Sequence, residues 1–148
     1  MASKSCAGES GQRHDHWGRE MAGEKILIAD DSTHVRMLVR GALEECGYSI
    51  VEAVDGADAL QKAIDEQPDL MLLDLMMPEL DGFEVLQFMN RRPETSNIKV
   101  IMLTGSAERS NQQYGYTLGV VGYVVKPVSA ADLQTAVARA LRPVNPWG

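Results

Sequence analysis

A chain of 148 residues has room for one ordinary domain, whose core needs neither disulfides nor a structural metal. Its formal net charge of -7 argues against a nucleic-acid surface, which requires clustered lysine and arginine. The sequence contains no apolar run of the length of a membrane span, and the two cysteines match no metal spacing. We therefore expect a reduced, cytoplasmic protein without membrane insertion.

The two ends of the chain differ from its middle. Residues 1–23 are rich in serine, glycine and mixed charge and lack apolar periodicity, so they predict a flexible N-terminal extension. Apolar periodicity runs through residues 24–142, and prolines interrupt the short C-terminal tail, 143–148. The sequence thus predicts one domain, 24–142, with no output domain in the few residues after it.

Strands and helices alternate from the start of the domain. Lys25 to Ala29 has the pattern of a buried strand, and the apolar residues after it recur at helical spacing up to Gly47. A second strand, Ser49 to Ala53, precedes a second helical pattern. Two acidic residues, Asp30 and Asp31, lie between the first strand and the first helix.

The third strand delivers an aspartate to its end. Leu70 to Leu73 is an unbroken apolar run, which is typical of a strand covered on both faces, and Asp74 follows it directly. Pro78 and a turn signature up to Gly82 separate this strand from a helical pattern, Phe83 to Asn90. A carboxylate where a buried strand becomes a loop requires an explanation.

Polar groups also end the last two strands. Val100 to Leu103 leads into Thr104, and a fifth, shorter strand leads into Lys126. The helix between them is weakened by Gly115, since glycine inside a helix costs about 1 kcal/mol relative to alanine. Ser129 is placed to cap the last helix.

Five strands alternating with five helices predict an α/β fold, a doubly wound parallel sheet with helices on both faces. The carboxyl ends of all strands then share one edge, where open α/β sheets bind ligands. Neighbouring carboxylates are best stabilised by a cation and an ammonium group, and their oxygens suit Mg²⁺. The polar groups expected at this edge are Asp30, Asp31, Asp74, Thr104 and Lys126.

A cation, an ammonium group, a hydroxyl and an aspartate together predict a phosphoryl-transfer site. Asp74 would form an acyl phosphate, Lys126 would neutralise phosphoryl oxygens together with Mg²⁺, and Thr104 would donate a hydrogen bond to them. All of these residues except Asp74 also have a structural explanation. Asp30 or Asp31 could cap the first helix, Thr104 could be an ordinary strand-end hydroxyl, and Lys126 could be a surface charge. Complementary polar residues at several strand ends that share one edge are a rare coincidence, and this favours the functional interpretation.

Several motifs carry a resemblance to a known family: ILIADDS with the acidic pair, LLDLMMPELDG with Asp74, VIMLTG with Thr104, and YVVKP with Tyr123 and Lys126. Through these motifs, residues 24–142 resemble the response-regulator receiver domain of two-component signalling, similar to stand-alone chemotaxis-type regulators. The resemblance implies a flavodoxin-like (βα)5 sheet with strand order 2-1-3-4-5.

The resemblance also implies roles that the residue pattern alone does not. A histidine kinase would donate the phosphoryl group, Thr104 and Tyr123 would form a conformational switch, and the Lys126-Pro127 bond would be cis. The implied metal ligands are Asp30, mostly through water, Asp31, Asp74 and the Met76 carbonyl. We expect a monomer or weak dimer that is not an enzyme and that controls a protein partner. The partner face would be formed by the fourth helix, the fifth strand and the fifth helix.

Two other functions stay open from the sequence. A haloacid-dehalogenase-like phosphatase also uses an aspartate nucleophile and Mg²⁺, but it requires a second acid where this chain has Met76. A receiver-like binding module that works without phosphorylation is disfavoured by the intact set of polar residues. In the implied partner face, Gly119 to Gly122 reads GVVG, so this face is apolar and glycine-rich compared with many receivers.

Overall fold

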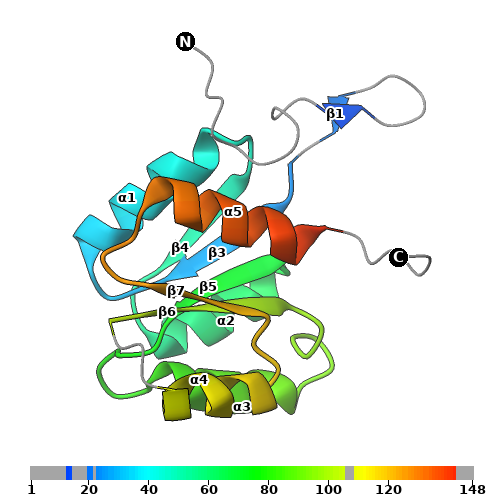
Figure 1. Cartoon of the computed structure of the whole chain (residues 1–148). Helices are drawn as coiled ribbons and strands as arrows, with labels where there is room; N and C mark the ends of the chain where they lie inside the picture. The colour runs from blue at the N-terminus through cyan, green and yellow to red at the C-terminus, as the bar shows by residue number, and fades with distance from the viewer. Residues whose placement is uncertain (1–12, 15–19, 22, 106–108, 143–148) are drawn as a thin grey trace, which may run out of the picture.

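The computed structural model describes residues 13–14, 20–21, 23–105 and 109–142, which include a five-stranded parallel sheet (Figure 1). Its strands are β3 (Lys25–Ala29), β4 (Ser49–Ala53), β5 (Leu70–Asp74), β6 (Lys99–Thr104) and β7 (Gly122–Val125). Their order across the sheet is β4-β3-β5-β6-β7. This order confirms the predicted flavodoxin-like arrangement 2-1-3-4-5.

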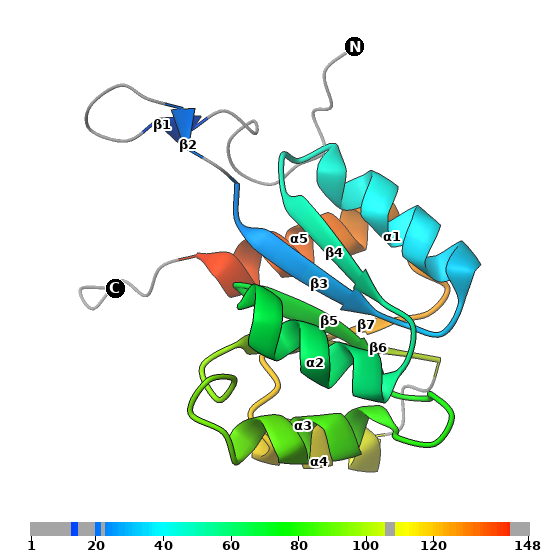
Figure 2. The same cartoon turned by 180° about the vertical axis from the view of Figure 1, so that it is seen from behind.

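Helices cover both faces of the sheet. They are α1 (Thr33–Glu44), α2 (Gly56–Glu66), α3 (Gly82–Asn90), α4 (Arg109–Thr117) and α5 (Ala130–Leu141). Front and back views show α1 and α5 on one face and α2, α3 and α4 on the other (Figures 1 and 2). Within the described part of the chain, no helix has both the length and the apolar character that a bilayer crossing requires.

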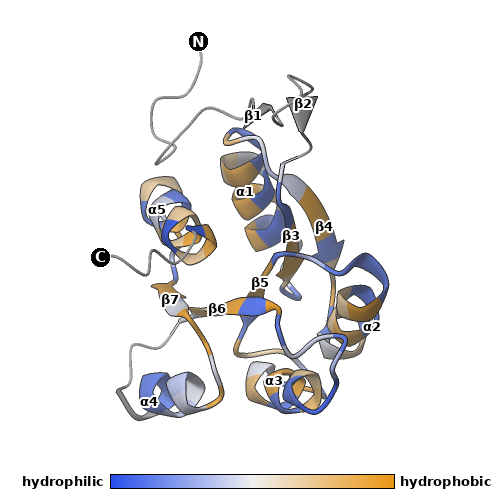
Figure 3. Ribbon diagram, turned by 90° about the vertical axis from the view of Figure 1, so that its right-hand side faces the viewer, coloured by the Kyte–Doolittle hydropathy of each residue, from blue (hydrophilic) through white to orange (hydrophobic). Residues whose placement is uncertain are grey.

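Alternation along the strands divides the core between the two faces. Ile26 and Ile28 of β3 pack in the cluster with α1 and α5, whereas Leu27 and Ala29 pack in the cluster with α2 and α3. β5 is buried along its whole length, as its apolar run predicts. Figure 3 shows broad apolar stretches on the other helices, whereas α4, which contains no aliphatic residue, is coloured hydrophilic to neutral.

Side chains cap the first turn of helices α1, α2, α3 and α5. The N-caps are Ser32, Asp55, Asp81 and Ser129, each of which accepts a hydrogen bond from a backbone N–H three residues later. Ser129 therefore caps α5 as predicted. The cap of α1 is Ser32, so the structural explanation of Asp30 or Asp31 as its N-cap is wrong, and their carboxylates need another role.

Helix α4 runs through Gly115 without interruption, although the sequence predicts a weak point there. A Cβ atom on residue 115 would lie 1.8 Å from the hydroxyl oxygen of Tyr123, which comes from β7. That hydroxyl donates hydrogen bonds to the backbone carbonyls of Asn111 at 2.9 Å and Gln112 at 3.3 Å. The glycine thus makes room for a contact that anchors α4 to the sheet.

The expected N-terminal extension and C-terminal tail lie mostly outside the described residues. Within 1–23, β1 (Arg13–His14) and β2 (Glu20–Met21) form a short antiparallel ladder. Cys46, which follows α1, is buried, and the other cysteine, Cys6, lies outside the described residues.

Candidate functional site

Strands of the sheet end at one edge and place the predicted polar residues there. Asp74 is the last residue of β5 and Thr104 the last of β6, while Asp30 and Lys126 directly follow β3 and β7. One carboxylate oxygen from each of Asp30, Asp31 and Asp74 lies within 4.8 Å of the others. The structure therefore brings together carboxylates that are far apart in the sequence.

The loop after β5 holds the Asp74 side chain in place, and Asp74 is only 2% exposed. Its Oδ1 accepts a hydrogen bond from the backbone N–H of Met76 at 3.2 Å. The loop returns to the sheet at Gly82, whose N–H donates to the Leu75 carbonyl at 2.9 Å. A Cβ atom on residue 82 would lie 2.7 Å from the Asp74 carbonyl oxygen, so this close approach requires glycine.

Asp30 and Asp31 have different environments. Asp30 is fully buried, and its Oδ1 accepts a hydrogen bond from the backbone N–H of Ser32 at 2.8 Å. Its backbone N–H donates to the Ala53 carbonyl at 3.2 Å, which ties it to the end of β4. Asp31 is exposed. One acid of the pair therefore lies inside the site, and the other faces solvent.

Lys126 bridges the two buried carboxylates. Its Nζ lies 2.9 Å from Asp30 Oδ2 and 3.2 Å from Asp74 Oδ1. The backbone N–H of Lys126 donates to the Thr104 carbonyl at 2.7 Å, which extends the pairing of β6 and β7 into the site. The Lys126–Pro127 bond is cis, as the family resemblance implies.

Burial and the surrounding charges change the pKa values of Asp74 and Lys126. Burial, and then the charge of Asp30, raises the pKa of Asp74 to about 6, against the opposing effects of Lys126 and the Met76 N–H. Burial acts to lower the pKa of Lys126, but its hydrogen bond to Asp30 and the charge of Asp74 outweigh burial and raise it. The site thus pairs a firmly protonated lysine with carboxylates that repel one another.

The donor set of this site fits a small, hard cation. Asp30, Asp31 and Asp74 offer clustered carboxylate oxygens, and Lys126 supplies one positive charge against them. Oxygen ligands without thiolate or imidazole suit Mg²⁺ or Ca²⁺ better than Zn²⁺. A divalent cation would also offset the repulsion that raises the pKa of Asp74.

Thr104 and Tyr123 lie on neighbouring strands in different surroundings. Thr104 is buried at the end of β6, with 1% of its surface exposed. Tyr123 pairs in register with Met102, and its hydroxyl contacts the α4 carbonyls described above. Its ring meets that of Tyr116 edge-on, with centroids 5.3 Å apart. The aromatic candidate for a switch is therefore held by α4 in this structure.

Sequence reasoning missed one buried charged residue beside the site. Arg36 on α1 is only 8% exposed and donates from Nη1 to the Asp30 carbonyl at 2.6 Å. Its Nε donates to Glu52 of β4 at 2.9 Å. The sequence shows that Glu52 lies within the otherwise largely apolar strand SIVEA, but it does not show that Arg36 of α1 is its partner.

Comparisons with known proteins agree with this geometry. The family model described as "Response regulator receiver domain" matches residues 26–138. The phosphate regulon transcriptional regulatory protein PhoB of Pseudomonas aeruginosa is 36% identical over 126 residues, which are 85% of this chain and 55% of PhoB. The DNA-binding dual master transcriptional regulator RpaA of Synechocystis is 38% identical over 118 residues, which are 80% of this chain and 49% of RpaA. This chain thus spans about half the length of the curated relatives it matches.

A solved structure shares the fold over its entire length. The chemotaxis protein CheY4 of Vibrio cholerae is 32% identical to this chain, with a TM-score of 0.77, and the match covers 81% of this chain and 100% of the CheY4 chain. The similarity to CheY4 therefore concerns a whole chain, whereas the similarity to PhoB and RpaA concerns about half of each protein.

Proposed function

Because this chain belongs to the response regulator receiver domain family of two-component signalling, we propose that it is a switch controlled by phosphorylation of Asp74. A histidine kinase donates the phosphoryl group, and the phosphorylated form changes its affinity for a protein partner. The observation that carries the proposal is the pair of contacts from Lys126 to Asp30 and Asp74 at a buried strand end. Asp31 completes the cluster of carboxylates around them.

The Asp74 carboxylate is the proposed nucleophile. One of its oxygens attacks the phosphorus of a phosphohistidine, the O–P bond forms, and the N–P electron pair leaves with the imidazole. Lys126 neutralises charge on the phosphoryl oxygens, and the Thr104 hydroxyl donates a hydrogen bond to them. Because the pKa of Asp74 is raised to about 6, nearby positive charge shifts its carboxyl group toward the ionised form. The ionised carboxylate is the nucleophile.

Mg²⁺ is the cation that we propose for this site. The residues that would hold it are Asp31, Asp74 and the Met76 carbonyl, with Asp30 acting mostly through water. When bound, the ion supplies positive charge against the transferring phosphoryl group. The oxygen-only donor set supports this choice.

The proposed output is a conformational change. Thr104 moves toward the phosphoryl group, and Tyr123 leaves its place on α4 and turns into the space that Thr104 vacates, so that phosphorylation shifts a two-state equilibrium. The surface of α4, β7 and α5 is the proposed partner face, and Tyr116, Val121 and Val125 are exposed on or beside these elements. We propose that the chain acts in the cytoplasm as a monomer or weak dimer, and that it is not an enzyme with a separate substrate.

The partner that we propose is a protein rather than a nucleic acid. The net charge of -7 opposes contact with a phosphate backbone. RpaA is DNA-binding by name, but this chain matches only 49% of RpaA. The DNA-related function of that relative is therefore not carried over to this chain.

A phosphatase of the haloacid-dehalogenase type is less well supported. Met76 occupies the position of the second acid that such an enzyme requires, and this residue is 73% exposed. A thioether cannot transfer the proton that an acid would handle there. A binding module that works without phosphorylation is also less well supported, because it gives no reason for Lys126 to lie between two buried carboxylates.

The experiment that tests the proposal is incubation of the chain with acetyl phosphate and Mg²⁺, followed by intact-mass measurement. We expect a gain of one phosphoryl group that requires the metal and disappears in EDTA. Asp74→Asn should gain none, whereas Asp65→Asn, which removes an exposed carboxylate on α2, should be labelled normally. A wild-type chain that gains no phosphoryl group contradicts the proposal. Continuous hydrolysis of a phosphomonoester that depends on Asp74 would favour the phosphatase instead.

A further inference from the structure

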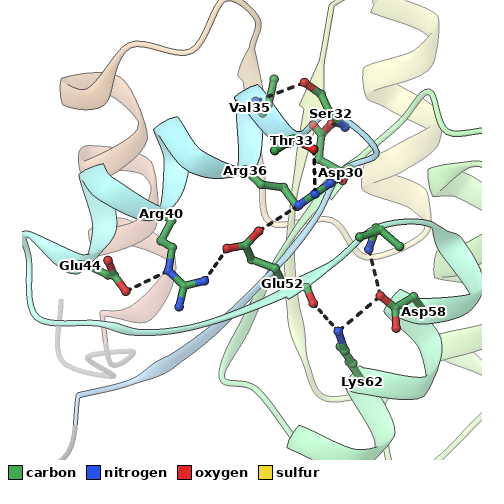
Figure 4. A network of polar contacts seen from close by, with 11 residues as sticks. Asp30, Ser32, Thr33, Val35, Arg36, Arg40, Glu44, Glu52, Asp58 and Lys62 are labelled. Carbon is green, nitrogen blue, oxygen red and sulfur yellow. Dashed lines mark hydrogen bonds and ion pairs between the residues drawn. The ribbon is translucent and has the colours of Figure 1, made fainter.

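A network of charged side chains links α1, β4 and α2 close to Asp30 (Figure 4). Arg36 is largely buried in this network although it carries a guanidinium group. That group donates from Nη1 to the Asp30 carbonyl at 2.6 Å, from Nε to Glu52 Oε1 at 2.9 Å and from Nη2 to Thr33 Oγ1 at 3.2 Å. A guanidinium with each nitrogen engaged in this way is held in one orientation.

The hydrogen bond from Arg36 fixes the peptide group that joins Asp30 to Asp31. The carboxylates of both residues belong to the acidic cluster that includes Asp74. On its other side, the N–H of Asp30 donates to the Ala53 carbonyl at 3.2 Å. The backbone of Asp30 is thus anchored to β4 twice, directly through its N–H and through Arg36 and Glu52 at its carbonyl.

Glu52 fastens Arg36 to the sheet. It lies in β4, in register with Ile28 of β3, and its second carboxylate oxygen pairs with Arg40 on the next turn of α1. The hydrogen bond from Arg40, helped by that from Arg36, lowers the pKa of Glu52 against the effect of burial. The Glu52 carbonyl also accepts a hydrogen bond from Lys62 of α2 at 2.6 Å. Glu52 is therefore an ionised and well-fixed anchor.

We propose that Arg36, clamped by Glu52, is a positioning residue for the acidic cluster: it holds the Asp30–Asp31 turn so that both carboxylates can meet a divalent cation beside Asp74. This inference deepens the proposed function and rests on it. The guanidinium also places positive charge one peptide group away from the cluster, which reduces repulsion among the carboxylates. Removal of an outer contact that orients a metal-binding group typically weakens metal affinity by about 10- to 100-fold.

The competing interpretation is that Arg36 only fastens α1 to β4. Arg40 offers a matched control, because it lies on the same helix and pairs with the same Glu52 and with Glu44 at 3.0 Å. Among the described hydrogen bonds and ion pairs, Arg40 makes none with Asp30. Loss of either arginine should weaken the attachment of the helix, but only loss of Arg36 should change cation binding.

The test measures Mn²⁺ binding to the full chain by the paramagnetic signal of the free ion, together with the Mg²⁺ concentration that half-saturates phosphorylation by acetyl phosphate. We expect Arg36→Met to weaken Mn²⁺ binding about tenfold and to raise the half-saturating Mg²⁺ concentration similarly. In Arg40→Met, the Mn²⁺ affinity and the half-saturating Mg²⁺ concentration should stay within about twofold of the wild-type values. The Mn²⁺ affinity of Arg36→Lys should lie between those of the two methionine variants. An ammonium group keeps the positive charge, but it cannot donate to Asp30 and Glu52 at the same time as the planar guanidinium does.

Urea unfolding of each variant identifies conditions in which all of them are folded during these measurements. Equal Mn²⁺ affinity in Arg36→Met and Arg40→Met would overturn the inference and leave Arg36 as a structural contact. If Arg36→Met does not fold, Glu52→Gln loosens the same clamp from β4, and unchanged Mn²⁺ affinity in that variant would also overturn it. A wild-type chain that binds no Mn²⁺ overturns the inference directly. A wild-type chain that binds Mn²⁺ in an Arg36-dependent way but never accepts a phosphoryl group would refute only the proposed function.

Discussion

The hydroxyl oxygen of Tyr123 lies 1.8 Å from the position that a Cβ atom would take on residue 115. Gly115 is therefore the residue that lets Tyr123 reach the α4 carbonyls of Asn111 and Gln112. This contact joins the proposed switch residue to a helix of the proposed partner face. The resting position of Tyr123 consequently depends on a glycine that lies in a different element.

Gly115→Ala should destabilise the protein, although alanine favours a helix over glycine by about 1 kcal/mol. The added Cβ cannot coexist with Tyr123 in its present place, and overpacking of this kind costs about 1 to 3 kcal/mol. In a Tyr123→Ala background the clash is absent, so the same change should be neutral or stabilising. Urea unfolding of both single variants, the double variant and wild type measures this coupling. An equal cost in both backgrounds would contradict the contact.

Asp74→Asn should stabilise the metal-free protein by an amount that grows with pH. The pKa of Asp74 is raised from 3.8 to about 6 in the folded protein, so the unfolded chain ionises first and the wild type loses stability between about pH 4 and pH 6. Above this window the loss should be about 2 kcal/mol after solvent screening, and below it the two proteins should converge. Urea unfolding in EDTA across the window measures the difference. A difference that does not vary with pH would show that Asp74 does not titrate in this way.

Thr104→Ala should still accept a phosphoryl group, because Asp74 and Lys126 are unchanged, but Tyr123 should stay on α4. The reason is that the hydroxyl of Thr104 is the proposed link between the phosphoryl group and the tyrosine. Spectra of ¹³C-labelled tyrosine rings before and after acetyl phosphate treatment follow Tyr123. Wild type and Thr104→Ser, which keeps the hydroxyl, should show the change. A change as large in Thr104→Ala would refute the coupling.

The phosphorylated form should be long-lived, because hydrolysis needs a water in line with the O–P bond and Met76 cannot orient one. Met76 is largely exposed two residues after Asp74, and Ser106, two residues after Thr104, lies outside the described residues. Met76→Asn combined with Ser106→Glu should accelerate decay about tenfold, which is about 1.4 kcal/mol of barrier.

Loss of the acyl phosphate after removal of the donor, at saturating Mg²⁺, measures this lifetime. Met76→Leu keeps an apolar side chain and should decay like wild type. Decay of the double variant at the wild-type rate would place control of the lifetime in other groups.

The convergence of Asp30, Asp74 and Lys126 could be predicted from the sequence because it follows from topology. A parallel sheet places every strand's carboxyl end on one edge, so an aspartate or lysine after each strand must come close. The bridging position of Lys126, with contacts of 2.9 and 3.2 Å, is consistent with that expectation. The separate environments of Asp30 and Asp31 could not be predicted, because they depend on the turn in which the Asp30 carboxylate accepts a hydrogen bond from the Ser32 N–H.

The clamp formed by Arg36 and the slot at Gly115 could not be predicted, because each joins elements that only the folded chain brings together. Arg36 and Arg40, one turn apart on a helix, have the spacing of an exposed charged face, and their shared partner Glu52 lies in a different element. In the sequence, Gly115 indicates a weak point in a helix. Only the packing of α4 against β7 shows that the Tyr123 side chain occupies the space that a Cβ atom on residue 115 would need.

The most direct test of the central claim is to locate the acyl phosphate in the chain. Wild type and Asp74→Asn are treated with acetyl phosphate and Mg²⁺, reduced with borohydride to convert any acyl phosphate to a stable alcohol, digested, and sequenced by tandem mass spectrometry. We expect one modified residue in wild type, Asp74, and none in the variant. Modification at a different residue, or equal labelling of Asp74→Asn, would contradict the assignment of Asp74 as the phosphoacceptor.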